Sequence, residues 1–217
     1  MTILRTPFSV FPSILLAFWL LMPNAGFSAP AKTPAKTPQL QAAEKLVGTM
    51  ANQAISIINK AAANDAAKEA AKVEFRNILR QNFDIAAIAR FTLGRYWRVA
   101  TPAQQASYTQ LLQTVILNKY ADRMLESSGK SAVVNGSQKL NAKDSVVNMT
   151  IQSNTGAAPV ALAWRVRQPT LNAQPKVIDL AVEGVSMSVT HRSDFTSTID
   201  SNGGKVQALI DALKAKK

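Results

Sequence analysis

Apolar residues recur every three or four positions through much of the first half of the sequence, which is the spacing of one face of an α-helix. The first stripe, rich in alanine, predicts a long helix over residues 40–61 that packs on its own domain. A second helix is expected over residues 64–83. Asp84 is then placed to cap a short helix that ends at Gly94.

A further helix start is indicated at Thr101, Pro102 and Gln104. The threonine hydroxyl can accept from a backbone amide of the first turn, Gln104 can reach back, and proline loses nothing at the first helical position. The helix that begins there has an apolar stripe wider than one packed neighbour requires. Its apolar members are Tyr108, Leu111, Leu112, Val115, Ile116, Leu117, Tyr120, Met124 and Leu125.

After Gly129 the apolar period changes from 3.6 to 2, which is typical of half-buried strands. Strands are expected around residues 147–151, 160–167 and 178–183, with a weaker one over 131–140. In the last strand the apolar positions switch parity at Gly184, which predicts a bulge or sharp bend before the strand resumes at Val185, Met187 and Val189.

Two short helices, around residues 195–199 and 206–213, are expected to close the chain, with a turn at residues 202–204 between them. Helices come first, then an antiparallel meander, then helices. The predicted class is therefore α+β, with N-terminal helices packed on a strongly bent antiparallel sheet.

The N-terminus has the pattern of a secretory signal peptide. Arg5 precedes an apolar run over residues 8–22, and small residues come after it, so cleavage is expected after Ser28. Residues 29–38 (APAKTPAKTP) are expected to be a Pro-rich linker. The predicted organisation is a signal peptide over 1–28, this linker, and one domain over 39–217. An uncleaved membrane anchor is the alternative, and either way the domain is expected in the periplasm.

The amino-acid composition excludes most catalytic mechanisms. The 217 residues include no cysteine and one histidine, so thiolate nucleophiles, disulfides and multi-histidine metal sites are excluded. His191 is expected to be a surface residue at a strand end. Asp179 and Glu183 are expected to pair with Arg165 or Arg167 across the sheet. No nucleophile–base pair is visible, so the chain is not expected to be an enzyme.

The formal charge of +12 suggests an anionic partner. Export argues against nucleic acid as that partner, and removal of residues 1–28 with Arg5 leaves 24 − 13 = +11. The bent sheet and the wide-striped helix both offer broad apolar surfaces. These two apolar surfaces could pack together as a solid core or enclose a cavity between them. The pattern alone is consistent with either arrangement.

Several motifs bear on that choice. Phe83 and Asp84 lead to Leu93-Gly94-Arg95-Tyr96-Trp97-Arg98, and Ala100-Thr101-Pro102-Ala103-Gln104-Gln105 comes next. Tyr120, Asp179, Val182-Glu183-Gly184-Val185-Ser186, Arg192 and Phe195 complete the set. In this order and spacing they resemble the MlaC family of periplasmic lipid-binding proteins, also called toluene-tolerance auxiliary proteins, over about residues 40–213. One departure is Thr190-His191 before Arg192, where an aromatic residue is usual.

The resemblance implies an NTF2-like α+β domain with an apolar lipid-binding cavity and phospholipid as cargo, without a cofactor. It implies a carrier that shuttles lipid between an inner-membrane ABC transporter with an MCE ring and an outer-membrane lipoprotein–porin complex. A monomer without catalytic or nucleic-acid-binding activity is expected. Two alternatives are a carrier of hopanoid-type lipids and a basic interaction module at anionic membrane surfaces.

Strand parity and the wide helical stripe select the candidate lipid-binding residues. They are Leu112, Val115, Tyr120, Met124, Val147, Met149, Ile151, Leu162, Trp164, Val166, Leu180 and Val182. Arg95 and Arg98, beside Tyr96 and Trp97, are candidates for headgroup or partner contacts at the mouth. Salt-bridged surface groups are an equally good interpretation of these two arginines.

Overall fold

The computed structural model describes residues 36–61, 64–125, 130–154 and 156–215. The predicted signal peptide (1–28) and most of the predicted linker (29–35) lie outside the described residues. In the described part, six α-helices pack on a five-stranded antiparallel sheet, so the predicted α+β class is confirmed. Among the described residues, no helix is both long and apolar enough to cross a bilayer.

The sheet is a simple meander in which neighbours along the chain are neighbours in space. Its strands are β1 (Lys130–Lys139), β2 (Asp144–Ser153), β3 (Val160–Arg167), β4 (Lys176–Val182) and β5 (Val185–Ser186), in the order β1-β2-β3-β4-β5. The register shifts between Val134 and Gly136 in β1, and again between Arg165 and Val166 in β3. Such irregularities increase the local bend of a strand.

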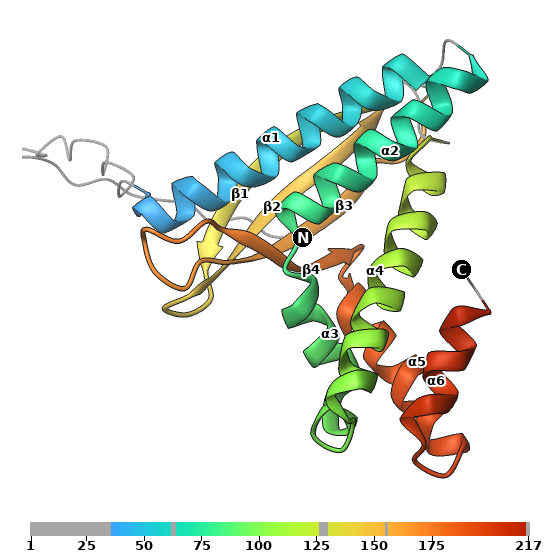
Figure 1. Ribbon diagram of the computed structural model, residues 1–217. Coiled ribbons are helices and arrows are strands. Elements are labelled where there is room, and N and C mark those ends of the chain that lie inside the picture. Colours follow the sequence, from blue (N-terminus) through green and yellow to red (C-terminus); the bar gives the residue numbers. More distant parts are fainter. Residues whose placement is uncertain (1–35, 62–63, 126–129, 155, 216–217) are drawn as a thin grey trace, which may run out of the picture. The chain divides into compact units, whose positions relative to one another are not determined.

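Helices α1 (Pro38–Ala61) and α2 (Asp65–Asn82) form an antiparallel pair along one face of the sheet (Figure 1). Helix α1 contacts β1 and β2 directly, because its alanine-rich stripe allows a close approach. The helix begins at Pro38, one residue inside the predicted linker. Asn64 caps α2 by accepting from the amide of Ala67 at 2.8 Å.

The capping signals of the next helices are confirmed. Asp84 accepts from the amide of Ala87 at 2.9 Å and starts α3 (Ile85–Leu93), which leads into the 3₁₀ turn η1 (Gly94–Arg98). Helix α4 (Pro102–Leu125) begins with the expected reciprocal pair. Thr101 Oγ1 accepts from the amide of Gln104 at 3.2 Å, and Gln104 Oε1 accepts from the amide of Thr101 at 3.0 Å.

The predicted continuation of the last strand through Met187 and Val189 is wrong. Glu183 and Gly184 have φ of 49° and 79°, so the chain turns tightly and β5 is only two residues long. Ser186 Oγ then accepts from the amide of Val189 at 3.1 Å and starts α5 (Met187–Ser201). The predicted sharp bend at Gly184 is confirmed, but this serine cap makes the next segment helical instead of extended.

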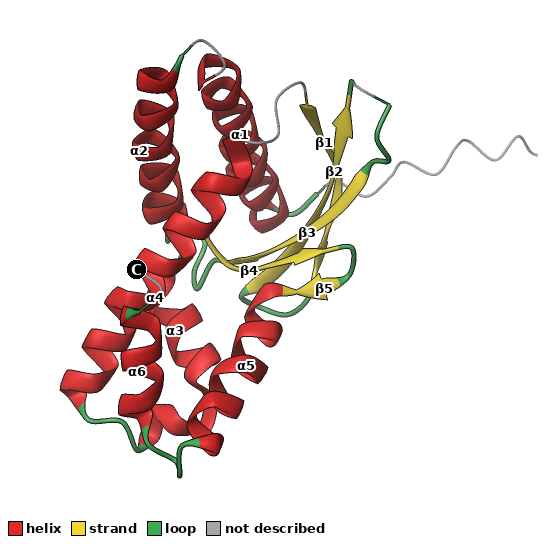
Figure 2. Cartoon of the chain, turned by 90° about the vertical axis from the view of Figure 1, so that its right-hand side faces the viewer, coloured by secondary structure: helices red, strands yellow, loops and turns green. Residues whose placement is uncertain are grey.

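Helix α5 therefore begins earlier than the predicted short helix, and it places His191 within a helix rather than at a strand end. The expected turn at residues 202–204 leads to α6 (Val206–Lys214). Helices α3, α4, α5 and α6 pack together at one end of the sheet (Figure 2). Their shared interior, called the helical core below, includes Leu93, Tyr108, Leu112, Ile199, Leu209 and Ile210, all 2% exposed or less.

Candidate functional site

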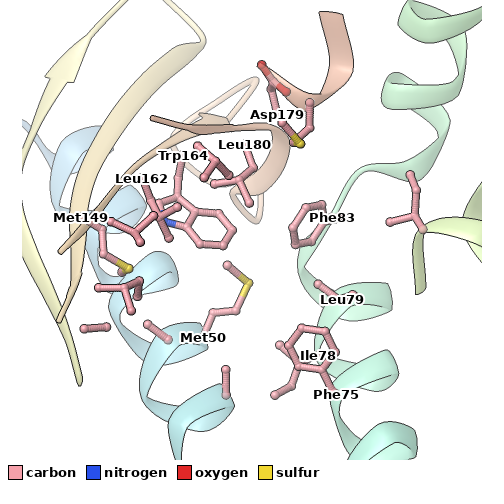
Figure 3. Close-up of a pocket in the computed structure, with 18 of the residues that line it drawn as sticks. Met50, Phe75, Ile78, Leu79, Phe83, Met149, Leu162, Trp164, Asp179 and Leu180 are labelled. Atoms are coloured by element: carbon pink, nitrogen blue, oxygen red, sulfur yellow. The ribbon is translucent and has the colours of Figure 1, made fainter. Parts of the chain in front are cut away.

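A cavity of about 300 Å³ lies between the α1–α2 pair and the sheet (Figure 3). Helix α2 packs on α1 and α4, and it faces β3 and β4 across this cavity. Most of the lining side chains are apolar. They are Met50, Ala51, Ala54, Ile55, Ile58, Phe75, Ile78, Leu79, Phe83, Ile88, Ile116, Ala132, Met149, Ile151, Val160, Leu162, Trp164, Leu180, Val182 and Met187, with Ser131, Asp179, Ser188 and His191.

Two walls of the cavity face each other. Phe75 and Leu79 project from α2, and Leu162 and Leu180 project from the sheet (Figure 3). Phe83 and Trp164 also face each other, and their rings pack edge to face with centroids 6.4 Å apart. The space between the walls is suited to an elongated apolar group, because it offers large apolar side chains and few polar atoms.

Three of the four polar lining residues in the described part of the chain, Asp179, Ser188 and His191, lie where α5 begins, and the fourth, Ser131, is on β1. Asp179 accepts from Ser186 Oγ at 2.6 Å and from the amide of Ser188 at 2.9 Å. His191, one turn further along α5, stacks on Phe195 with centroids 5.3 Å apart. Most of the polar lining residues therefore lie at this end of the cavity, and Asp179 is held by α5 rather than by the expected arginine.

The arginines of β3 are paired elsewhere. Arg165 and Arg167 both bind the buried carboxylate of Asp144, each with a shortest contact of 2.7 Å. The hydrogen bonds from Arg167 and then Arg165 hold the pKa of Asp144 well below its usual range, against the opposing effect of burial. Arg165 lies directly opposite Asp179 in the register of β3 and β4, as expected across the sheet. The expected ion pairing of the two arginines with Asp179 or Glu183 is wrong, because both guanidinium groups bind Asp144. The carboxylate of Glu183 instead accepts from the backbone amide of Ala161.

Six of the twelve sequence-predicted wall residues lie on the cavity. All six are on the sheet, on the face that strand parity selected. They are Met149, Ile151, Leu162, Trp164, Leu180 and Val182.

The other six have different positions. Val147 and Val166 are 0% and 2% exposed in the packing between α1 and the sheet, so they are core residues beside the cavity. Leu112 is in the helical core and Val115 packs against it. The side chains of Tyr120 and Met124 lie outside the part of the chain that the structure describes.

Neither Arg95 nor Arg98 lines the cavity. Both are exposed on η1, which contacts α3 and α5. Arg95 hydrogen-bonds to Tyr96 and forms an ion pair with Asp200 of α5. Arg95 is therefore a salt-bridged surface group, the alternative interpretation of this position.

The sequence pattern does not predict that α1 and α2 form a wall of the cavity. Met50 and Phe75 line the cavity although their helical stripes predicted ordinary packing. Phe75, Ile78 and Leu79 recur at the three- and four-residue spacing of one helix face, which was the available signal. This spacing identifies the apolar face of α2, but it does not give the distance between that face and the sheet.

The fold and the cavity define an α+β protein with an interior site for an apolar ligand. Residues 48–215 match the model of the MlaC protein family, so the chain belongs to the MlaC family. This confirms the resemblance derived from the motifs.

Two relatives illustrate the family likeness. The chain is 24% identical over 118 residues to the toluene tolerance protein ttg2D of Pseudomonas putida, a match that covers 54% of this chain and 53% of the relative. The matched segment thus spans about half the length of that relative. A phospholipid-binding protein of Ralstonia solanacearum, solved in complex with a phospholipid, has a similar fold with a TM-score of 0.68. That match has 22% identity and covers 80% of this chain and 96% of the solved chain.

Proposed function

We propose that this protein is a periplasmic phospholipid carrier that holds acyl chains in the cavity between α1–α2 and the sheet. The observation that carries the proposal is the cavity itself, whose opposing walls are built almost wholly from apolar side chains. Membership of the MlaC family supports it, as does the fold shared with a protein solved in complex with a phospholipid.

An interior site is the physical requirement for such cargo. Each CH₂ removed from water is worth about 0.8 kcal/mol, so a lipid with roughly thirty methylenes resists leaving a bilayer by about 25 kcal/mol. A shallow groove cannot offset this, because it leaves most of each chain in water. An apolar cavity replaces the bilayer contacts, and flexible Met50 and Met149 allow its wall to adapt to the chains.

The carrier role includes delivery across the periplasm. Lipid extraction needs a donor that lowers the barrier, and delivery needs an acceptor. The proposed partners are an inner-membrane ABC/MCE complex and an outer-membrane lipoprotein–porin complex. The proposed protein is a monomer that binds and transfers lipid without changing it chemically, and its signal peptide is removed near Ser28.

Lipid uptake from vesicles tests the proposal directly. Purified protein is stripped of lipid, incubated with vesicles of labelled phospholipid, separated from them and analysed by native mass spectrometry. We expect one phospholipid per protein, retained at high salt, because acyl-chain capture is not screened by ions. Protein that acquires no lipid, or that loses it as salt rises, contradicts the carrier function and favours surface attachment.

A pair of variants locates the lipid. Leu162→Glu places a charge on the cavity wall and should reduce uptake at least about tenfold, because a charge cannot be buried against acyl chains. Val133→Glu is the matched control on β1, where the side chain is 43% exposed, and it should leave uptake unchanged. If Leu162→Glu fails to fold by circular dichroism, Ala132→Trp, which fills the cavity instead, provides the same test.

A further inference from the structure

The side chain of Trp164 carries a polar group within the apolar wall. Its indole extends from β3 toward Phe83 across the cavity (Figure 3). The nitrogen Nε1 is shielded from solvent and has no acceptor among the described residues. A buried donor without a partner costs about 1–3 kcal/mol, so a tryptophan here is unfavourable unless something else supplies an acceptor.

The position of Trp164 along the cavity indicates where that acceptor lies. Trp164 is paired with Leu180, whose neighbour Asp179 belongs to the polar end of the cavity with Ser188 and His191. In the other direction β3 continues to Leu162 and Val160, which line the apolar part. Trp164 thus stands at the boundary between the polar end and the apolar length of the cavity.

A lipid has a boundary of the same kind. In a glycerolipid, the ester carbonyls lie between the polar headgroup and the hydrocarbon chains, and each carbonyl oxygen is a hydrogen-bond acceptor. Ether-linked lipids and hydrocarbon-rich polycyclic lipids have no acceptor carbonyl at this place. The donor at Trp164 therefore distinguishes these classes by chemistry rather than by size.

We propose that Trp164 Nε1 donates a hydrogen bond to an acyl-ester carbonyl of the bound lipid, and that this contact selects acyl-ester glycerolipids over ether-linked or hydrocarbon cargo. The proposal rests on the carrier function proposed above. It also orients the lipid, with the headgroup toward the start of α5 at Ser188 and His191 and the chains toward Phe75 and Leu79.

Nε1 is shielded by its neighbours. A lipid carbonyl therefore reaches this nitrogen only when side chains that line the cavity move. Met50 and Met149 line the same cavity, and an unbranched thioether changes rotamer at low cost. Lipid binding then satisfies a donor for which the described residues supply no acceptor. The selectivity arises because an ester carbonyl is a stronger hydrogen-bond acceptor than an ether oxygen, and a hydrocarbon has no acceptor at all.

The test compares two lipids that differ only at the linkage. Stripped protein is offered equal amounts of a diacyl and a dialkyl-ether phospholipid with the same headgroup and chain lengths. We expect wild type to take up the diacyl lipid with about fivefold preference, or about 1 kcal/mol at 1.4 kcal/mol per tenfold. Trp164→Phe, which keeps an aromatic ring and removes the donor, should lower that ratio to about one.

Trp97→Phe is the matched control, since Trp97 is on η1 and does not line the cavity. It should keep the wild-type ratio. The indole ¹H–¹⁵N signal that disappears in Trp164→Phe should move downfield when wild type binds the diacyl lipid and stay in place with the ether lipid.

The two levels of the proposal fail differently. Failure to take up either lipid contradicts the carrier function itself. Uptake of both lipids in equal amounts by wild type, or an unchanged preference in Trp164→Phe, overturns the role of Trp164 and leaves the carrier function standing. Equal movement of the indole signal with both lipids overturns it as well.

Discussion

The helical core and the cavity are lined by similar apolar side chains, yet one is filled and the other is open. In the helical core, Leu112 and Ile199 are completely buried. On the cavity wall, Leu162 and Leu180 are only half-buried. The difference arises from the backbone, because α3 to α6 pack directly on one another while α2 faces β3 and β4 across open space.

Apolar side chains therefore fill a core in one region of this fold and line open space in the other. A filled core gains the full free energy of burial during folding. A cavity wall gains part of it at folding and the remainder when a ligand enters. The two regions should therefore respond differently to the same substitution.

The largest contrast is expected between two leucine-to-alanine variants. Leu112→Ala should lower the free energy of unfolding of lipid-free protein by about 2–5 kcal/mol, because it creates a void in a filled core. Leu162→Ala should lower it by less than about 1 kcal/mol, because it enlarges an existing cavity. Urea denaturation measures both, and equal losses would show that the cavity wall is packed as tightly as the core.

Two glycine-to-alanine variants should have effects of opposite sign. Gly94 has φ of 58°, and a Cβ there would lie 3.1 Å from Nε of Arg192, so Gly94→Ala should destabilise the protein by about 1–3 kcal/mol. Gly48 is within α1 and a Cβ there meets nothing closer than Val134 at 3.9 Å. Gly48→Ala should therefore stabilise by about 0.5–1 kcal/mol. Thermal unfolding measures both, and a neutral Gly94→Ala would contradict the tight contact between η1 and α5.

Acid should weaken the part of the sheet that charge stabilises. Because the pKa of Asp144 is lowered by Arg167 and Arg165, its contribution is complete above the unfolded pKa of about 4 and is lost as pH falls further. At pH 7, Asp144→Asn should cost about 1–2 kcal/mol. The gap between variant and wild type should narrow below pH 4 in urea titrations, and a constant gap from pH 7 to pH 2 would contradict this assignment.

The smallest effect is expected from a hydrogen bond inside the helical core. The hydroxyls of Thr92 and Tyr108 are 2.7 Å apart and buried. Thr92→Val should cost about 1 kcal/mol, because the phenol then loses its partner. Lipid uptake should be unchanged, since neither residue lines the cavity. Impaired uptake in a folded Thr92→Val protein would show that the helical core and the cavity are coupled.

Local signals in the sequence predicted most of the secondary structure. The caps at Asp84 and Thr101 are short-range hydrogen bonds, so a few residues determine them. The strand error at Met187 has a local origin too. The alternation Val185, Met187, Val189 fits a strand, but Ser186 caps a helix there, and two residues with positive φ before it end the sheet.

The cavity was harder to predict because it is a relation between elements. Period-2 alternation identified the inner face of β3, where Leu162 and Trp164 line the cavity and Val166 is buried in the core. All three residues occupy the same alternating positions of β3. They differ only in whether the cavity or packed side chains lie opposite them. The motif around Arg95 identified the family, but it also suggested that Arg95 lies at the mouth of the cavity. Arg95 instead pairs with Asp200, which is more than a hundred positions away in the sequence, so a local motif could not reveal this contact.

The meander topology has a consequence for how the molecule assembles. Strands β1 to β4 pair with their neighbours in the chain, so each pairing closes a short loop, whereas α1 must find β1 and β2 across a long intervening segment. Local pairings form faster than distant ones. We expect pulse-labelling hydrogen exchange to detect protection of the amides of β2 and β3 before the amides of α1 become protected by packing on the sheet. The cavity would then come into existence only in the last step of folding, after one of its walls is complete.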